Sequence, residues 1–358
     1  MTAAWRELPP GEAATWTTRV YSAGAPLWQL PFWTAFLDRS GLRTAARTLP
    51  VRRFRYFVQP GRAWACVMEV AAAGYKAALV QDGPVGLTGP VDAATIGRLC
   101  AMLRARGYVF VRFSNRPDRL ATVSSQHRAV PVDLLPCLQR AGWELHVPLV
   151  SDEDRMLAAF SQRARRAIRR AESEGWEIVR ATADDGFDQV YGLLAETAAR
   201  KGFRAPPPRE TFAALVADAA PVDGVRMYLA CRPDGGPASA VVAVVDGTTW
   251  HYLWGGVDAE HLRGGVSPTA LLHWTAMRDA IRRGADAYNL GARSPSSVEH
   301  FKRQFRPLDV EPPPAVTVPL RLLPATAWRR VALPASRVLW RPVRKVWHRL
   351  AAATEHVG

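Results

Sequence analysis

The chain has 358 residues, 48% of them hydrophobic, enough for two domains of about 150 to 200 residues that each bury a core. Its 47 Lys and Arg against 32 Asp and Glu give a formal net charge of +15. This charge predicts attraction to phosphate groups, in nucleic acid, on an anionic membrane surface or in a pyrophosphate-bearing substrate. The sequence has no apolar stretch of about 18 residues to span a bilayer, and it has no signal peptide pattern. It therefore predicts a cytoplasmic protein, with peripheral contact at the inner face of the membrane left open.

The first half predicts a run of strands followed by a helix and one more strand. In chain order the predicted elements are a leader over 1–24, a helix over 28–37, strands over 54–58, 63–70 and 75–81, a helix over 93–106 and a strand over 108–113. Gly83 and Pro84 supply a turn after the third strand, and Gly107 ends the second helix.

The second half repeats this order. A long helix is predicted over 152–175, because its first turn is acidic and Gly175 is placed to stop it. The elements predicted after it are a strand over 176–181, helices over 186–200 and 209–220, strands over 225–232, 238–246 and 248–256, a helix over 268–283 and a strand over 285–291. The two halves therefore indicate a tandem duplication of one α+β unit.

The C-terminal segment, residues 321–358, differs in composition from the rest. It holds eight Lys and Arg and one acid, Glu355, for a net charge of +7. Leu339, Val343, Val346 and Leu350 recur at helical spacing, which predicts a basic amphipathic helix. Such a helix docks on anionic lipid or RNA phosphate, or it packs on the fold as a terminal helix; the pattern leaves both readings open.

Several segments together resemble the Fem family, the aminoacyl-tRNA-dependent transferases that add bridge amino acids to peptidoglycan precursors. The segments are FSQRARRAIRRAESEGWEI (160–178), LLAETAARKGFRAPPPRETF (193–212), HYLWGGV (251–257), SPTALLHWTAMRDAIRRGADAYNLGA (267–292) and HFKRQFRP (300–307). The resemblance covers about residues 27–320. It implies a mixed α+β protein with two tandem GNAT-like acyltransferase domains, at 25–150 and 151–320. No long coiled-coil insertion is expected, and Asn289 and Ala292 stand where the family typically has Asp and Gly.

Transfer of an aminoacyl ester to an amine needs a donor for the developing oxyanion and an acceptor for a proton. The resemblance makes Lys302 the oxyanion donor, with Phe301 and Phe305 beside it lowering the local dielectric; the alternative is a surface lysine lying over aromatics. His251 and Asp258 are weaker candidates for the base. The family's schemes imply that a substrate group removes the proton, and the sequence indicates no covalent intermediate and no metal site.

Three further sets of residues are candidates for binding. Arg200, Lys201 and Arg204 resemble the family's diphosphate-binding region, although a solvated basic helix end has the same pattern. Tyr252 and Trp254 are predicted to line the acceptor cleft or to pack in the core, and Phe305 is predicted to be a substrate-binding residue. A tRNA phosphate track is predicted from one helix face with arginine at i, i+3 and i+7: Arg163, Arg166 and Arg170.

These patterns predict an aminoacyltransferase that uses aminoacyl-tRNA as co-substrate, a peptide or lipid-linked cell-wall precursor as acceptor, and no cofactor. An acyl-CoA-dependent N-acyltransferase of the same fold is the first alternative. Residues 261–268 are a degenerate version of the CoA pyrophosphate loop Q/R-x-x-G-x-G/A, which disfavours this alternative. A non-catalytic RNA- or membrane-binding module is the second alternative.

Overall fold

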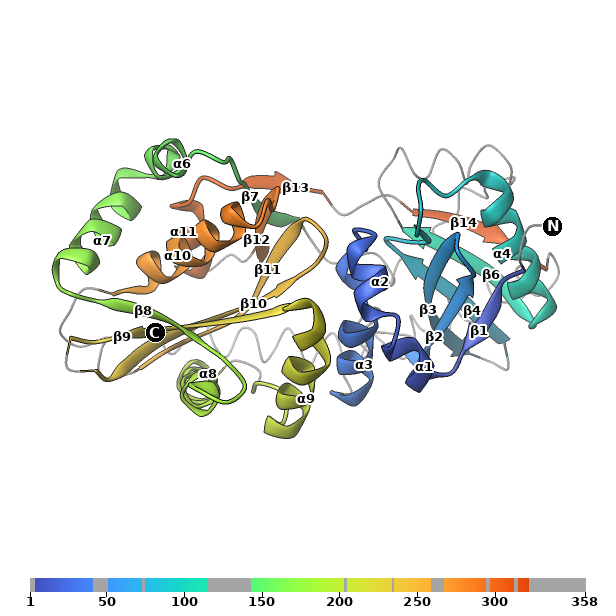
Figure 1. Cartoon of the computed structure of the whole chain (residues 1–358), viewed down its shortest axis with the longest axis horizontal. Helices are drawn as coiled ribbons and strands as arrows, with labels where there is room; N and C mark the ends of the chain where they lie inside the picture. Colours follow the sequence, from blue (N-terminus) through green and yellow to red (C-terminus); the bar gives the residue numbers. More distant parts are fainter. Residues whose placement is uncertain are drawn as a thin grey trace, which may run out of the picture. The chain divides into compact units, whose positions relative to one another are not determined.

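The computed structural model divides the chain into two compact units. It describes residues 4–40, 51–72, 75–114, 143–202, 205–233, 235–258, 267–293, 297–311 and 315–321. Unit 1 is formed by Met1–Ala13, Gly41–Arg140 and Pro313–Gly358, and unit 2 by Ala14–Ser40 and Ala141–Pro312. Each unit has its own sheet and core (Figure 1).

Unit 1 contains a sheet of order β1-β2-β3-β4-β6-β14, with the short β5 paired to β3. Its strands are β1 (Arg6–Leu8), β2 (Val51–Gln59), β3 (Ala63–Ala72), β4 (Tyr75–Gln81), β5 (Val85–Gly86), β6 (Tyr108–Ser114) and β14 (Ala315–Pro319), and its helices are α1 (Pro10–Ala14) and α4 (Ala93–Ala105). The side chain of Asp92 caps α4 by accepting the N–H of Thr95 at 2.7 Å. The helix then packs Ile96, Leu99 and Leu103 onto the sheet.

Unit 2 contains a sheet of order β13-β7-β12-β11-β10-β9-β8. Its strands are β7 (Glu144–Pro148), β8 (Glu177–Ala181), β9 (Val225–Cys231), β10 (Pro237–Val245), β11 (Thr249–Val257), β12 (Ala287–Ala292) and β13 (Leu308–Val310). Its helices are α2 (Thr17–Ser22), η1 (Leu27–Gln29), α3 (Pro31–Arg39), α6 (Glu153–Ala159), α7 (Gln162–Ser173), α8 (Phe187–Lys201), α9 (Arg209–Ala219), η3 (Ala220–Val222), α10 (Thr269–Arg282) and α11 (Ser297–Arg303).

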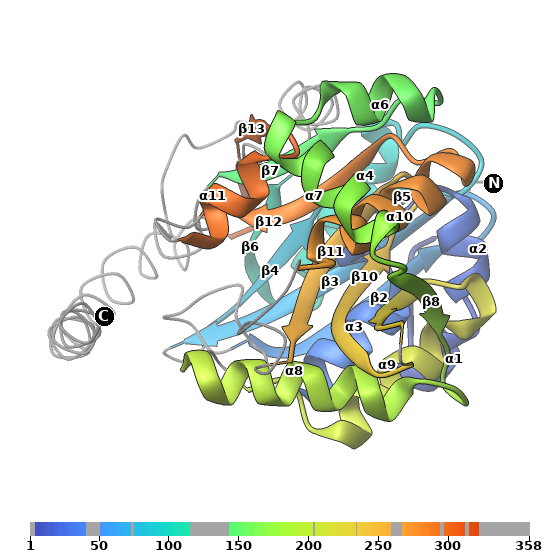
Figure 2. The same cartoon turned by 90° about the vertical axis from the view of Figure 1, so that its left-hand side faces the viewer.

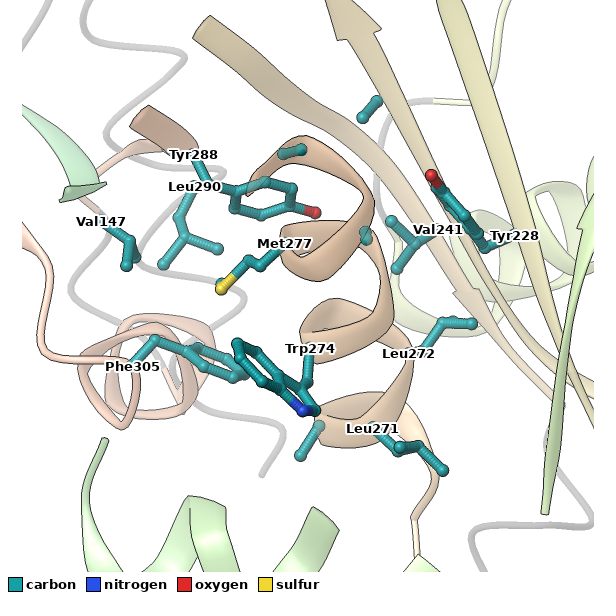
Figure 3. Packing of buried hydrophobic residues seen from close by; sticks show 14 of the residues in the cluster. Val147, Tyr228, Val241, Leu271, Leu272, Trp274, Met277, Tyr288, Leu290 and Phe305 are labelled. Atoms are coloured by element: carbon teal, nitrogen blue, oxygen red, sulfur yellow. The ribbon is translucent and has the colours of Figure 1, made fainter. Parts of the chain in front are cut away.

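Helices cover both faces of the unit 2 sheet. Helices α6, α7, α10 and α11 lie over one face, and α8 and α9 lie over the other (Figures 1 and 2). The core on the first face is built around α10, where Trp274 and Met277 pack between the strands and Phe305 (Figure 3). Tyr288 and Leu290 of β12 close this core from the sheet side.

The two sheets follow the same succession, which confirms the predicted tandem repeat of a GNAT-like unit. In unit 1 three antiparallel pairings lead to β4, which is joined through α4 to the parallel neighbour β6, and β14 is antiparallel to β6. In unit 2 three antiparallel pairings lead to β11, which is joined through α10 to the parallel neighbour β12, and β7 is antiparallel to β12. No helix in the described residues exceeds the 15 residues of α8.

The helix predicted over 152–175 is wrong as one element, because the chain breaks it into α6 and α7. Phe160 is extended, with φ −65° and ψ 159°, and its ring is buried against Trp274 and Phe305 at centroid distances of 5.4 and 5.3 Å. Ser161 then starts α7: its hydroxyl accepts the N–H of Ala164 at 3.2 Å. Sequence reasoning read the acidic first turn and Gly175 and overlooked this second cap.

The division of the chain also differs from the expected boundaries at residues 24, 150 and 320. The supposed leader contains β1, which pairs with β2, and α2, which belongs to unit 2. The helix predicted over 28–37 is present as α3, but it packs on α9 of unit 2, and β14 returns to complete the sheet of unit 1. The predicted C-terminal helix lies outside the described residues.

No helix among the described residues is long and apolar enough to cross a membrane.

Candidate functional site

The candidate site lies where β11 and β12 part. These parallel strands pair from Thr249↔Ala287 to His251↔Asn289. Among the described residues no pairing of the two strands is recorded beyond that point, although β11 continues to Val257. The pairing of β12 with β7 is irregular between Asn289 and Ala292. Gly291 lies in this interval with φ +84°, a conformation that side chains other than glycine rarely adopt. Backbone groups at the end of β12 are therefore turned out of the regular sheet.

Lys302 reaches this strand end from α11. Its Nζ donates to the carbonyl of Ala292 at 3.2 Å, the one hydrogen bond recorded for it among the described residues. The residue is 8% exposed, and a Cβ on Gly291 would lie 3.7 Å from Nζ. Burial lowers the pKa of Lys302 from its ordinary value of 10.5, and the nearby Glu299 carboxylate opposes this shift. The lysine thus keeps ammonium protons for a further acceptor, and a lower pKa makes it a stronger proton donor.

Aromatic rings surround His273 of α10 close to Lys302. The His273 ring lies 4.7 Å from Tyr252 and 5.6 Å from both Phe301 and Phe305, measured between centroids. Burial, reinforced by the charge of Lys302, lowers the pKa of His273 to about 3, and burial raises the pKa of Tyr252 to about 12. His273 and Tyr252 are therefore neutral at pH 7, so these two rings bring no charge to the neighbourhood of Lys302. Sequence reasoning missed His273, because a single His in an apolar helix gives no signal.

Tyr252 and Trp254, predicted to line one cleft together, make contacts on opposite faces of the sheet. The register of β11 with β10 shifts so that Val242 faces Trp254 and the next residue, Ala243, faces Tyr252. Leu253 is thus the extra residue of a β-bulge, which reverses the alternation of side chains. Tyr252 packs on His273 of α10, whereas Trp254 packs on Phe36 of α3 and Phe212 of α9.

The predicted diphosphate site is only partly described. Arg200, at the last turn of α8, donates from Nη2 to the carbonyl of Val257 at 2.8 Å, and Lys201 is exposed beside it. Arg204 lies outside the described residues. Val257 is five residues along β11 from Tyr252, about 16 Å at the usual rise of an extended strand. Arg200 therefore binds the C-terminal end of β11, whereas Tyr252, near Lys302, lies in the first half of the same strand.

The arginines of α7 divide into engaged and unengaged side chains. Arg165 donates to the carbonyls of Ala158 and Phe160, both at 2.7 Å, and Arg170 pairs with Glu174 at 2.9 Å. Three exposed arginines have no recorded partner among the described residues, and we call them the arginine face: Arg163, Arg166 and Arg169. This face points away from Ala164, Ile168 and Ala171, which are buried. The prediction that Arg170 belongs to this phosphate track is weakened by its ion pair.

The start of α7 is fixed next to α11. The N–H of Ser161 donates to the carbonyl of Gln304 at 2.9 Å, and the rings of Phe160 and Phe305 pack edge to face. The arginine face therefore begins beside the helix that carries Lys302. Phe305 is 1% exposed and forms part of the core, and its predicted contact with substrate stays a prediction.

Neither weaker candidate for the base is free in the structure. His251 has Asp246 at 2.8 Å from Nε2 and Asn289 at 3.2 Å from Nδ1, so both ring nitrogens are engaged. Asp258 forms an ion pair with Arg232. In the described part of the chain, no group of three or more His, Cys, Asp or Glu side chains is arranged to hold a metal ion.

Residues 158–303 match the family model of the acetyltransferase (GNAT) domain. The match includes α7, α10 and Lys302, and it supports an acyltransferase of the GNAT fold. The curated proteins contain no match to this sequence.

Solved structures share this architecture at low sequence identity. FemX is 14% identical with a TM-score of 0.65, over 91% of this chain and 99% of FemX. A conserved protein of unknown function from Bacteroides thetaiotaomicron is 12% identical with a TM-score of 0.55, over 90% of this chain and 100% of that one. The C-terminal domain of a putative lysylphosphatidylglycerol synthetase from Agrobacterium fabrum is 14% identical with a TM-score of 0.51, over 91% and 97%. The predicted resemblance to the Fem family is confirmed at the level of the fold.

Proposed function

We propose that this protein transfers an amino acid from aminoacyl-tRNA to an amine on a peptidoglycan precursor or a similar peptide. The observation that carries the proposal is the buried ammonium of Lys302, which has one recorded hydrogen-bond partner within the described ranges. It lies at the point where two parallel strands of the GNAT-like unit part. An ammonium in such a position is expensive to bury and is expected to have a chemical task. FemX, whose fold this chain shares, supports the choice of reaction class.

The reaction proceeds by direct attack. The acceptor amine attacks the carbonyl carbon of the aminoacyl ester, a C–N bond forms, and the carbonyl electron pair moves to oxygen. Lys302 donates to this oxyanion, and the neutral ring of His273 and the apolar rings near it strengthen the interaction by excluding water. The tetrahedral intermediate collapses as the C–O bond to the ribose breaks. The proton lost by the amine balances the charge on the leaving oxygen, either directly or through another substrate group.

The arginine face supplies the second part of the proposal, contact with the tRNA donor. It is exposed, carries three guanidinium groups for which the described part of the chain records no partner, and starts beside α11. Guanidinium groups bind phosphate oxygens through paired hydrogen bonds. Phosphates bound along α7 would bring the ester end of the RNA toward Lys302. Arg200 and Lys201 remain our candidates for the diphosphate of the acceptor.

The tail over residues 321–358 extends the proposal to the membrane. Its net charge of +7 fits an anionic lipid surface, where a lipid-linked acceptor resides. Deletion of 321–358 is expected to weaken binding to vesicles that contain anionic lipid, with the two units still folded. Equal vesicle binding by the full and shortened chains would contradict this part of the proposal.

One observation favours a second candidate, an N-acyltransferase that uses acyl-CoA: the family model matched by residues 158–303 is that of an acetyltransferase domain. Lys302 would serve a thioester carbonyl in the same way. Thermal stabilisation separates the two candidates, because a ligand that binds the folded state raises its melting temperature. Stabilisation by charged tRNA and not by CoA is expected; the reverse result would favour the second candidate.

The proposal is tested with purified protein, a mixture of charged tRNAs and an amine acceptor, either nucleotide-linked or lipid-linked pentapeptide. An amide product that depends on both substrates supports it. Absence of product with every acceptor, while acyl-CoA donors give product, would contradict it.

A further inference from the structure

A chain of hydrogen bonds crosses the sheet of unit 2 beside the candidate site. Asp246, after β10, accepts from Nε2 of His251 at 2.8 Å. The Asn289 amide nitrogen on β12 lies 3.2 Å from Nδ1 of His251 and donates to Glu144 of β7 at 3.0 Å. Asn289 is 4% exposed and Asp246 is 7% exposed, so this chain is largely removed from water. Buried polar chains of this kind are costly unless each member is satisfied.

The orientation of the Asn289 amide fixes the state of His251. Its Oδ1 accepts the backbone N–H of Gly291 at 2.7 Å, so its Nδ2 must be the atom that points to Glu144 and His251. A donor facing Nδ1 requires a lone pair there, and the proton of His251 therefore lies on Nε2, facing Asp246. His251 thus links two strands through its two ring nitrogens. His146 of β7 also faces Glu144, with 3.2 Å between the two side chains.

The same amide shapes the strand end on which Lys302 rests. The bond from Gly291 N–H to Asn289 Oδ1 spans two residues and holds Gly291 at φ +84°. The next residue is Ala292, whose carbonyl is turned to accept from Lys302. The path from His251 to the lysine therefore passes through one side-chain amide and one turn of the backbone.

We infer that Asn289, held by His251 and Glu144, is a positioning residue that sets the place of the Lys302 ammonium through Gly291 and Ala292. The inference rests on the proposed function for its effect on catalysis, but the position of Lys302 can be measured without substrate. The sequence has lysine only at Lys76, Lys201, Lys302 and Lys345. The Lys302 signal in ¹³C-lysine NMR spectra is therefore easily assigned by its loss in Lys302→Met.

Asn289→Asp is the sharpest perturbation, because it keeps the acceptor for Gly291 N–H and removes the donor. The new carboxylate repels Glu144, and His251 can bridge Asp246 and the carboxylate only as an imidazolium. We expect the ¹⁵N NMR signals of His251 to shift, because its Nδ1 then faces a carboxylate instead of an amide donor. We expect the ¹³Cε signal of Lys302 to shift, and kcat to fall about 10- to 100-fold with KM for the donor nearly unchanged, as for a misplacement of about 1 Å.

Tyr228→Phe is the matched control. It removes one hydrogen bond between the same sheet and α10, from the Tyr228 hydroxyl on β9 to Asp279 at 2.5 Å. Strands β10 and β11 separate β9 from β12 in the sheet order. Tyr228→Phe should lower stability and leave the Lys302 signal and kcat unchanged. If Asn289→Asp does not fold, His251→Leu and His251→Gln replace it. Gln has an acceptor and a donor for the same two partners and should retain the Lys302 signal, whereas Leu should shift it.

An unshifted Lys302 signal in both Asn289→Asp and His251→Leu would overturn the inference. A shifted Lys302 signal in Asn289→Asp, together with a wild-type protein that makes no amide from any charged tRNA, would overturn the proposed function and leave the positioning role standing. The two failures are therefore distinguishable.

Discussion

Replacing Lys302 by Met is expected to remove most of the activity while leaving the fold equally stable or slightly more stable. The lost hydrogen bond to Ala292 is worth about 0.5 to 1.5 kcal/mol net, and the carbonyl of this exposed residue can turn to water. Against this loss, methionine does not carry a charge into a site that is only 8% exposed. The free energy of unfolding should therefore change by no more than about 1 kcal/mol, whereas loss of an oxyanion donor costs about 10²- to 10³-fold in kcat.

The stability difference should also depend on pH. Because burial lowers the pKa of Lys302 below 10.5, the unfolded chain binds a proton that the folded protein has lost over the interval between the two values. The wild type therefore gains stability as pH rises through that interval, and Lys302→Met does not. Any excess in the free energy of unfolding of Lys302→Met over the wild type should be largest near neutral pH and should shrink toward pH 10.5.

Two measurements check this prediction: initial rates of amide formation, and urea unfolding followed by circular dichroism. Lys76→Met is the control, since Lys76 lies over the Tyr108 ring at 4.6 Å in unit 1; it should lose about 0.5 to 1 kcal/mol and keep its turnover. A Lys302→Met protein with normal turnover would refute the catalytic role. A loss of several kcal/mol in stability would show that Lys302 is structural.

Substitution of the three residues of the arginine face by Gln should weaken RNA binding. It should also reduce the steepness of the plot of log K against log salt by about 0.7 to 0.9 per lost phosphate contact. Arg170→Gln should change the affinity and this slope little, because Arg170 pairs with Glu174. Equal salt slopes in a filter-binding assay would contradict the assignment of that face. Gly256→Ala should destabilise unit 2 by about 1 to 3 kcal/mol, because a Cβ there would lie 2.5 Å from the backbone of α8. Gly192→Ala should stabilise α8 by about 0.5 to 1 kcal/mol, because, apart from its chain neighbours and the backbone of its own helix, no atom of the described residues lies within 4 Å of its new Cβ. Thermal unfolding of both variants checks the sign. The free energy of unfolding of the wild type should fall as the pH falls from 6.5 to about 3, because His273 takes up a proton on unfolding in that range. The loss from this residue is at most about 5 kcal/mol, and His273→Gln should not show it. Urea unfolding at several pH values measures this. An equal dependence of the free energy of unfolding on pH in the wild type and in His273→Gln would contradict the prediction.

Local patterns were sufficient to predict most elements of unit 2. The continuous apolar run of β10 and the breaks at Asp234-Gly235-Gly236 and Asp246-Gly247 indicate adjacent strands, and the structure pairs them as β9, β10 and β11. Hydrophobic periodicity likewise predicts α8, α9 and α10 within one or two residues at their ends.

Tertiary pairings were beyond the reach of those patterns. The strand β14 is recognisable only by its pairing with β6, which lies about two hundred residues earlier in the chain. Phe160 leaves the helical conformation because its ring fits between Trp274 and Phe305, a contact that no local pattern contains. Tertiary contacts of this kind decide which segment joins which unit.

The sequence was sufficient to predict Lys302 as a candidate site residue, but it was not sufficient to predict which side chains surround it. The resemblance at residues 300–307 identifies Lys302, but the bulge at Leu253, which sends Tyr252 and Trp254 to opposite faces, depends on pairing with β10. Asn289 looked like a departure from the family pattern, and the structure gives it three hydrogen bonds to side chains and backbone. Its role depends on strands β7 and β11, which are distant in sequence.

The central claim is that Lys302 serves the carbonyl of an aminoacyl ester. It is tested most directly by single-turnover transfer from charged tRNA to a pentapeptide amine, with wild type and Lys302→Met at saturating donor. We predict an amide product with the wild type and a rate lower by about 10²-fold or more in the variant, with RNA binding preserved. Equal rates for the two proteins would contradict the claim.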